Sequence, residues 1–366
     1  MDKKTYSKLL DSTITPAWLA LEQQEIIMNP LTEYVKSILP NKLFRFRECS
    51  ELSFEALYHD QIWVSAGKFM NDDYDARIYY DDQKIKQNMN ELYTDQGMLK
   101  VLENNDTLDR AEEAFKNIIP DMAMALSAFK QLSGIDRQAM SVKFKEYINT
   151  HSSRILDFIP EVVQNTTKFA CFSETIKSAM MWGHYAKNST GFAVAYDFTT
   201  GLEDQEQESY EKVKFNNFPK YCSLFPMLYE NKRYDATDYV FYMLKYALVA
   251  NAARANRYML PQQFLNAVVP CPDTFMGTKI ALHKSTEWRP EREWRLFCSS
   301  FDPEFNKKDH SFVVKRPIAV YLGRKISSIN EKMIKDIACE KGIPVYRMQM
   351  KEQSGRYELQ AVRQKK

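Results

Sequence analysis

Three glutamates, three arginines and two tryptophans fall within residues 283–297, HKSTEWRPEREWRLF. If EREWRLF forms a strand, its two-residue period places Glu291, Glu293 and Arg295 on one face. The opposite face would carry Trp294, which should pack inward. Two carboxylates on one face repel each other unless a cation or a ligand hydroxyl separates them. The segment is therefore either a salt-bridged strand in the wall of a domain or the acidic part of an active site.

Arg45 and Arg47, in the segment LFRFR, are candidate cations for this strand. Both would lie on one face of an earlier strand, so the two charged strands could pair across a sheet. Cross-strand ion pairs of this kind contribute little stability when they are exposed. A ligand cleft would use the same residues, and the sequence leaves both interpretations open.

A second candidate is the loop FMNDDYD, which follows the expected strand IWVSAG. It places Asn71 and three aspartates, Asp72, Asp73 and Asp75, within five residues. Oxygens so closely spaced can bind a hard cation, hold a ribose hydroxyl or cap a following helix. The spacing is not that of an EF-hand, because the glycine turn and the terminal glutamate are missing. Turn formation and ligand contact both remain open for this loop.

The third candidate is the segment SETIKSAMMWGHYAKNSTG, where a helix is expected to carry Trp182, His184 and Tyr185. On a helix, positions 181, 184, 185 and 188 form one broad face, so the imidazole and the phenol could point together. An aromatic ring beside an imidazole suits stacking on, and hydrogen bonding to, a base or a nicotinamide ring. The alternative is that the histidine is an ordinary interior residue.

Length and composition restrict the class of protein. With 366 residues, of which 45% are hydrophobic and 13% aromatic, the chain can form a full core and two packed regions. It has ten glycines and neither GxGxxG nor GxxxxGK[ST], so the common nucleotide-binding fingerprints are absent. The six cysteines form no CxxC pair, which gives zinc-finger and thioredoxin-like chemistry no support.

Charge and hydropathy bear on location. The formal net charge of +2 is no nucleic-acid footprint in itself. The N-terminal sequence lacks the apolar region of a signal peptide, and no run of 18 apolar residues occurs. We therefore expect a cytoplasmic protein without a membrane partner.

The hydrophobic patterns predict an α+β fold whose core is a mixed, largely antiparallel sheet with long helical insertions. Helices are expected over 1–38, over most of 81–165, after CFSE, over 235–268 and in NEKMIKDIACEKG. The expected strands are LFRF, IWVSAG, KFACFSE, GFAVAYDF, FPMLYE, EWRLFCS, PIAVYLG and IPVYRM. The predicted organisation is an N-terminal helical segment (1–40), an α+β core (41–80 and 166–350), a helical insertion (81–165) and a C-terminal tail (351–366).

The chain resembles a bacterial family of domains of unknown function in the order of its segments FRFR, FMNDDYD, CFSE, MMWGHYA, GFAVAYD, EWRPEREWRLF, AVYLGRK and IPVYRM. In that family an arginine-bearing strand, an FND-type loop, a CFS strand, a W-x-H-Y helix and a W-x-x-E-x-E-x-R strand recur in this order. The resemblance covers roughly residues 41–80 and 166–350. The segment 81–165 looks peculiar to this chain.

The layout is also similar to that of ADP-ribosyltransferases, including toxin and phage-defence enzymes that modify nucleic acids. This resemblance implies an ADP-ribosyltransferase-like core, with an arginine on the first strand and a glutamate late in the chain. The implied catalytic residues are Glu293 and Glu291. The residues expected to bind NAD are Arg45, Arg47, Ser65, Asn71, Asp72, Asp75, Ser173, Trp182, His184, Tyr185 and Arg295.

In such an enzyme a carboxylate stabilises the oxocarbenium-like ribose that forms when the bond to nicotinamide breaks. An aromatic ring stacks on the nicotinamide, and arginine pairs with the pyrophosphate. The resemblance thus implies NAD as a substrate, no metal, and a macromolecular acceptor, nucleic acid rather than protein. The setting would be a toxin or an anti-phage system, in which an antitoxin or defence protein could be a partner.

Two other classes of function stay open. One is a non-catalytic module that binds a nucleotide or a nucleic acid through the same residues. The other is a metal-dependent nuclease that uses Asp72, Asp73 and Asp75 together with Glu293.

Overall fold

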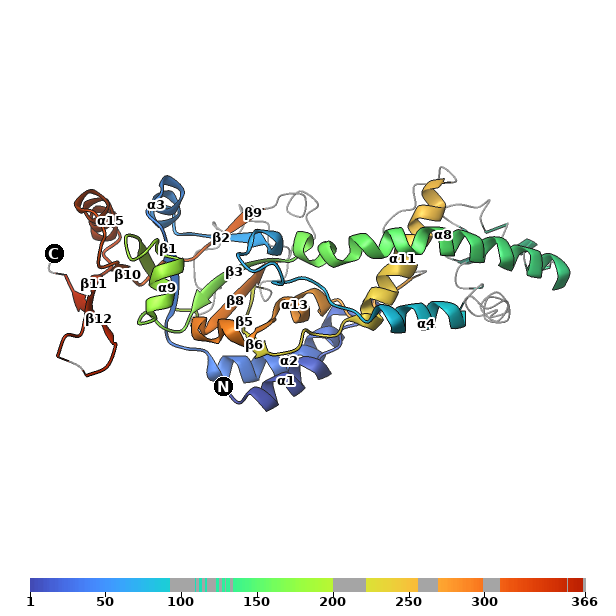
Figure 1. Cartoon of the computed structure of the whole chain (residues 1–366), viewed down its shortest axis with the longest axis horizontal. Helices are drawn as coiled ribbons and strands as arrows, with labels where there is room; N and C mark the ends of the chain where they lie inside the picture. Colours follow the sequence, from blue (N-terminus) through green and yellow to red (C-terminus); the bar gives the residue numbers. More distant parts are fainter. Residues whose placement is uncertain are drawn as a thin grey trace.

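The computed structural model describes residues 1–92, 134–199, 222–255, 269–298, 310–353 and 355–364, and scattered positions between 109 and 131. Within them, helices and a mixed, mostly antiparallel sheet of ten strands make an α+β fold, as predicted. Figure 1 shows an elongated molecule in which long helices project from the part that contains the sheet.

The main sheet is built from strands that lie far apart in the sequence. Their bounds are β1 (Leu43–Arg47), β2 (Gln61–Ala66), β3 (Lys168–Ser173), β4 (Phe192–Tyr196), β5 (Cys222–Pro226), β8 (Glu293–Cys298), β9 (His310–Val314), β10 (Ala319–Leu322), β11 (Val345–Met350) and β12 (Leu359–Arg363). The order is β12-β11-β10-β4-β1-β3-β2-β9, and β8 pairs with both β3 and β5. Only β10 and β11 are parallel among these described strands. A separate parallel pair joins β6 (Leu228–Glu230) to β7 (His283–Ser285).

Strand β3 divides the sheet, because it has three neighbours. One edge of β3 pairs with β8, and there Ser173 lies opposite Glu293. The other edge pairs with β1 where Phe44 lies opposite Ser173, and with β2 where Ser65 lies opposite Phe169. The sheet therefore branches at β3, one branch continuing through β1 and the other through β2.

Side-chain alternation explains these strands. In β1, Phe44 and Phe46 enter one apolar cluster with Trp182, whereas Leu43 enters another. Every position of β4 and of β8 is buried, as expected for central strands that are covered on both faces.

The helices have the bounds α1 (Lys3–Ser12), α2 (Leu21–Ile38), α3 (Glu51–Tyr58), α4 (Asp82–Leu92), α8 (Gly134–Thr166), α9 (Ala179–His184), α11 (Thr237–Ala255), α13 (Met276–Ala281) and α15 (Ser328–Glu340), with short 3₁₀ helices η1 (Gly67–Phe69) and η2 (Thr286–Glu291). Helix α3 begins after Ser50, whose hydroxyl accepts a hydrogen bond from the Ser53 amide and so caps the helix as expected. None of the described helices has both the length and the apolar character needed to cross a membrane.

Helices α4, α8 and α11 form a second apolar cluster of their own. Ile85, Ile159 and Leu244, one from each helix, pack within it, and Figure 1 shows the three helices projecting to the same side of the sheet. Helices α4 and α8 confirm helical structure at the two ends of the insertion expected at 81–165; most of its middle lies outside the described residues. The division of the chain into domains stays a prediction.

The N-terminal segment is helical, as predicted, and it forms two helices rather than one continuous helix. Helices α1 and α2 are separate, because Asp273 accepts hydrogen bonds from the amide and the hydroxyl of Thr15 between them, and Pro16 follows. Two large apolar side chains of this segment, Trp18 and Ile26, are 61% and 70% exposed.

The helix after β3 is shorter than expected. It consists of α9 alone, and Ser178 caps it by accepting a hydrogen bond from the Met181 amide. Residues 187–189 all have positive φ angles, a conformation in which a helix of L-residues cannot continue.

Strand β8 begins at Glu293, as the expected strand EWRLFCS does. The longer strand EREWRLF does not form, because Arg292 adopts a left-handed conformation with φ of 46°. The expected tail at 351–366 contains β12, which pairs antiparallel with β11.

Candidate functional site

Five charged side chains meet below the surface, on the side of the sheet that Glu293 faces. Asp75 comes from the loop after η1, Lys284 from β7, Glu291 from the end of η2, and Glu293 and Arg295 from β8. All five residues are between 0% and 7% exposed. Charges are this deeply buried only when they are paired, so the contacts among them decide what the group can do. We call these five residues the charged cluster.

Arg295 is the centre of the charged cluster. Its Nη1 and Nη2 atoms donate to the two carboxylate oxygens of Asp75, each at 2.6 Å, and its Nε donates to Oε1 of Glu293 at 2.7 Å. Nη1 also donates to the Ala281 carbonyl at 2.7 Å. The guanidinium lies 4.2 Å from the centre of the Phe169 ring. This bidentate pairing is the geometry for which arginine is suited and lysine is not.

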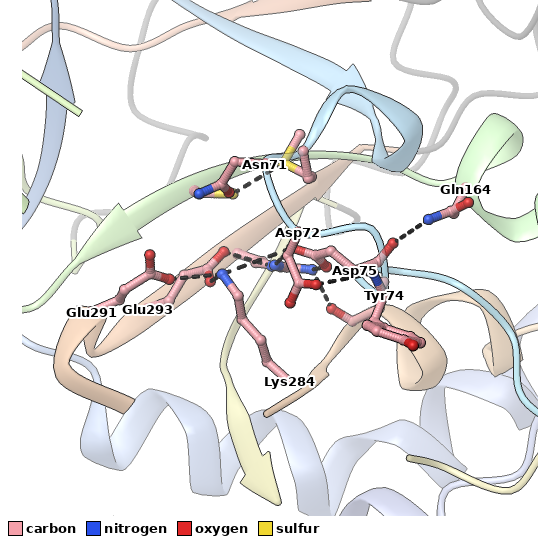
Figure 2. Close-up of polar contacts among 12 residues, drawn as sticks. Asn71, Asp72, Tyr74, Asp75, Gln164, Lys284, Glu291 and Glu293 are labelled. Carbon is pink, nitrogen blue, oxygen red and sulfur yellow. Dashed lines mark hydrogen bonds and ion pairs between the residues drawn. The ribbon is translucent and has the colours of Figure 1, made fainter. Parts of the chain in front are cut away.

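Lys284 bridges the two glutamates. Its ammonium donates to Oε2 of Glu291 at 2.7 Å and to Oε2 of Glu293 at 3.0 Å, and it lies 3.8 Å from Oδ2 of Asp75. Figure 2 shows this ammonium pointing toward the carboxylates. With three carboxylates against two cations, the cluster carries one excess negative charge when all five groups are ionised.

The two glutamates differ in their tendency to hold a proton. Burial acts to raise the pKa of Glu293, but the attraction of Arg295 and Lys284 outweighs it and lowers this pKa to about 2. For Glu291, burial and the neighbouring charge of Glu293 raise the pKa above its ordinary value despite Lys284. Glu293 is therefore a fixed anion, and Glu291 is the group that can gain and lose a proton. Environments that separate two carboxyl pKa values in this way are typical of acid–base pairs.

Tyr185 links Glu291 to the surface. Its hydroxyl donates to Oε1 of Glu291 at 2.5 Å and accepts from the side-chain amide of Asn71 at 3.1 Å. Asn71 is exposed and Tyr185 is half-buried. A continuous series of contacts therefore runs from solvent through Asn71 and Tyr185 to the charged cluster.

Local backbone geometry brings Glu291 and Glu293 together. The left-handed conformation of Arg292 makes the turn between η2 and β8. The Ser173 hydroxyl holds this turn by donating to the Glu291 carbonyl at 2.6 Å, and Tyr229 accepts from the Glu293 amide at 2.8 Å. The pair is thus fixed by turn geometry, not by strand alternation as predicted.

The loop after η1 positions Asp75 and Asn71. The Asp75 amide donates to the Asp72 carbonyl at 2.9 Å, and the Asp72 side chain accepts from the Tyr74 amide at 3.0 Å. Gln164 of α8 donates to the Asp75 carbonyl at 2.8 Å, as Figure 2 shows. Asp72 therefore stabilises a turn, whereas Asp75 turns inward to Arg295.

A hollow of about 370 Å³ lies between this loop and the end of α8. Its lining includes Lys68, Asp72, Asp73, Arg77 and Glu161. It shares Asp72 with the loop that carries Asn71 and Asp75, and no residue of the charged cluster lines it.

Three predicted binding residues have other surroundings. Trp182 is buried and donates to the Ile176 carbonyl at 2.7 Å, so it is part of the core under α9. His184 is exposed. The Ser65 hydroxyl contacts Nδ1 of His310 at 3.0 Å on neighbouring strands, which places it outside the charged cluster.

The expected pairing of Arg45 and Arg47 with the glutamates is wrong. Residues directly opposite each other on neighbouring strands share a face of the sheet. Because Phe44 lies opposite Ser173, and Ser173 opposite Glu293, these three side chains are on one face. Arg45 and Arg47 alternate with Phe44 and therefore lie on the other face.

The sequence prediction missed Lys284 and Tyr229. Lys284 lies within the charged segment, and two carboxylates expected on one face of a strand called for a cation beside them. Its position depends on β7, a strand of three residues that pairs with β6. A strand this short shows no hydrophobic periodicity from which it could be predicted. Tyr229 lies in the predicted segment FPMLYE, but a single tyrosine in a strand carries no signal of a distant contact.

Asp72, Asp73 and Asp75 do not converge on one point. Asp75 is committed to Arg295, and Asp72 to a backbone amide. Within the residues that the structure describes, no three or more His, Cys, Asp or Glu side chains are arranged to hold a metal ion. The carboxylates of this loop thus give the nuclease alternative no geometric support.

Comparison with known proteins shows a similarity over part of the chain. No curated protein and no solved structure matches the chain. Residues 181–296 match the model of a family described as a protein of unknown function, DUF2971. The matched residues include Tyr185, Lys284, Glu291, Glu293 and Arg295. Over these residues the chain is similar to a family of unknown function, in a range shorter than the expected 41–80 and 166–350.

Proposed function

We propose that this protein is an NAD-dependent ADP-ribosyltransferase-type enzyme whose reacting group is Glu291. Its acceptor would be a macromolecule, with nucleic acid favoured over protein, in a toxin or anti-phage defence setting. The observation that carries the proposal is the pair of adjacent glutamates with opposite pKa shifts, connected to the surface through Tyr185 and Asn71.

The structure changes the role that each glutamate would take. Both oxygens of Glu293 already accept hydrogen bonds, from Arg295 and from Lys284. Glu291 is bonded on one side to Lys284 and on the other to Tyr185. Since Tyr185 is half-buried, a ribose hydroxyl that displaced its phenol would reach Oε1 of Glu291 first. Glu291 is therefore the group assigned to the substrate, and Glu293 is assigned to hold Lys284 in place.

The chemistry suits a carboxylate of this kind. When the bond between ribose C1′ and the nicotinamide nitrogen breaks, the electron pair leaves with nicotinamide and the ribose becomes cationic. The excess negative charge of the cluster would stabilise that cation. The acceptor nucleophile then forms a bond to C1′ and gives its proton to Glu291, which the raised pKa of this carboxyl favours.

Two exposed arginines of the same segment can replace Arg45 and Arg47 in the proposal. Arg289 lies in η2, and Arg292 is the residue that follows the last residue of η2. Both arginines are exposed. Helix α9, which ends next to Tyr185, is in contact with η2. Two guanidinium groups beside the entry to Glu291 could pair with a pyrophosphate.

The test is the transfer of label from NAD. The full chain is incubated with NAD labelled in the adenylate phosphate, and with RNA, DNA or cell protein as acceptor. We expect the label to enter nucleic acid, and Glu291→Gln to reduce the rate by at least about 100-fold. Glu287→Gln changes an exposed glutamate of the same 3₁₀ helix and should leave the rate within about twofold. If the folded wild-type protein neither transfers label nor releases nicotinamide, the proposal fails.

A binding module is the second candidate, and one observation favours it. Every carboxylate of the charged cluster already has a cationic partner inside the protein. Charges that are already paired with each other inside the protein need no substrate. Their role could be structural, to hold a binding surface around Asn71 and Tyr185. Calorimetric titration with NAD separates the two candidates: heat of binding without nicotinamide release in any condition would favour the module.

A further inference from the structure

Within the described residues, one buried side-chain nitrogen or oxygen has no hydrogen-bond partner, and it is Nη1 of Arg45. Buried polar atoms are almost always paired, because leaving one unpaired costs about 1–3 kcal/mol. The exception therefore requires an explanation. Arg45 also belongs to the motif FRFR, which the proposed reaction does not use.

Arg45 lies where the sheet branches. Its Nη2 atom crosses from β1 to β2 and donates to the Trp63 carbonyl at 2.5 Å. Its guanidinium lies 5.7 Å from the centre of the Phe172 ring on β3. These contacts hold the side chain in place on the face opposite the charged cluster, but they provide no negative charge.

Arg47 is the second cation on this face. Two residues along a strand separate side chains by about 6.5–7 Å, so the two guanidinium groups are near neighbours. Each residue keeps some exposure. Neither forms an ion pair with a carboxylate of the described residues, whereas Arg295 binds two.

The electrostatic effect of this arrangement is visible in both groups. Burial and the neighbouring charge of Arg47 lower the pKa of Arg45 to about 9. Burial also lowers the pKa of Arg47. Both guanidinium groups remain charged at neutral pH, so the folded protein holds two partly desolvated positive charges that repel each other.

We propose that Arg45 and Arg47 form a phosphate-binding site on the face of the sheet opposite the charged cluster. Two guanidinium forks at this spacing match one phosphate group or two linked ones, because several oxygens can accept from both forks at once. A single carboxylate has only two oxygens and would neutralise one fork. The phosphate belongs either to a small phosphorylated ligand or to a nucleic-acid strand, and the site does not depend on the NAD reaction.

The experiment measures binding of two probes to the full chain at low salt. Inorganic pyrophosphate represents the small ligand, and a ten-nucleotide oligothymidylate represents the strand. The variants are Arg45→Met, Arg47→Met and the double variant. Arg154→Met, which removes an exposed arginine on α8, is the matched control.

We expect pyrophosphate to raise the melting temperature of the wild type and of Arg154→Met by the same amount, and to raise that of the double variant by less, since only the arginines beside Glu291 remain there. If a strand is the ligand, the oligonucleotide also binds. Its logarithmic salt dependence then becomes shallower by about 1.4 in the double variant, since each phosphate contact on a single strand contributes about 0.7. Binding of pyrophosphate alone identifies a small phosphorylated ligand.

Two results would overturn the site: neither probe binds the wild type, or both bind the double variant as tightly as the wild type. Arg47→Met keeps the test valid if Arg45→Met fails to fold, because Arg47 holds no strand contact comparable to the bond from Arg45 to Trp63. Glu291→Gln should bind both probes normally, which separates this site from the proposed reaction.

Discussion

Arg295 explains how this protein buries three carboxylates in a small volume. The guanidinium is fully buried and satisfies Asp75 with two hydrogen bonds and Glu293 with one. A buried ion pair of this kind gives little net stability by itself, but removal of one partner leaves the other charge uncompensated. The stability of the folded chain should therefore be sensitive to Arg295.

Arg295→Met should lower the free energy of unfolding by about 3–5 kcal/mol, because Asp75 and Glu293 lose their cation in a buried site. Arg292→Met removes an exposed arginine three residues earlier and should change it by no more than about 0.5 kcal/mol. Urea denaturation of the three proteins measures both effects. Equal stabilities for the two variants would contradict the account of Arg295.

The contributions of Glu293 and Glu291 to the free energy of unfolding should change with pH in opposite directions. The pKa of Glu293 is lowered from 4.5 to about 2, so the stability that this group contributes is present above pH 4.5 and is lost as the pH falls toward 2. The pKa of Glu291 is raised, so its contribution is present below pH 4.5 and is lost as the pH rises through the folded-state value.

Glu291→Gln should therefore remove a rise in stability that the wild type shows as the pH falls from neutral toward 4.5. Unfolding free energies measured in urea at half-unit steps of pH give the comparison. A wild type and variant whose curves run parallel over this range would show that the pKa of Glu291 is not raised.

Tyr185 should tune the proton affinity of Glu291. Its hydroxyl donates to the carboxylate and so favours the ionised form. Tyr185→Phe should raise the pKa of Glu291, as followed by nuclear magnetic resonance of ¹³C-labelled glutamate carboxyls. Tyr74→Phe, at an exposed tyrosine of the nearby loop, should have no effect. A titration unchanged by Tyr185→Phe would mean that the hydrogen bond does not form in solution.

At the scale of elements, the turn between η2 and β8 determines where the glutamates point. Arg292 is left-handed, with φ of 46°, a conformation that costs L-residues about 1–2 kcal/mol and β-branched residues more. Glycine adopts it without strain. The left-handed backbone at residue 292 should therefore determine which substitutions there give the more stable protein.

Arg292→Val should be less stable than Arg292→Gly by about 1–2 kcal/mol. At Arg289, within the 3₁₀ helix, the order should reverse, because glycine there only adds entropy to the unfolded chain. Four unfolding curves in urea test this. The same rank order at both positions would contradict the assigned turn.

Local patterns predicted the strands well, since the alternation in LFRFR and the continuous apolar run in FAVAY both reflect the burial of each strand. The N-terminal break was not predicted, because Thr15 is held by Asp273, 258 residues away. The glutamates were found, but not their partners. The bond between Arg295 and Asp75 joins residues 220 positions apart, and the register that puts Arg45 on the opposite face depends on three strands at once.

In the whole molecule, the two faces of the sheet at β3 carry different groups of charged side chains. The charged cluster lies on one face of the sheet, and the two arginines of β1 lie on the other. The helices α4, α8 and α11 have their own apolar cluster, yet Gln164 of α8 bonds the loop that carries Asp75. Helix α8 is therefore connected to the charged cluster by the hydrogen bond from Gln164 to the backbone of Asp75.

The proposed function requires that Glu291 act on NAD. The most direct test measures nicotinamide released from NAD by the wild type, Glu291→Gln and Glu287→Gln, with all three shown to be folded and with nucleic acid present. We predict release by the wild type and Glu287→Gln at similar rates, and a rate for Glu291→Gln lower by at least about 100-fold. Equal release by Glu291→Gln and the wild type, or no release by any of them, would contradict the claim.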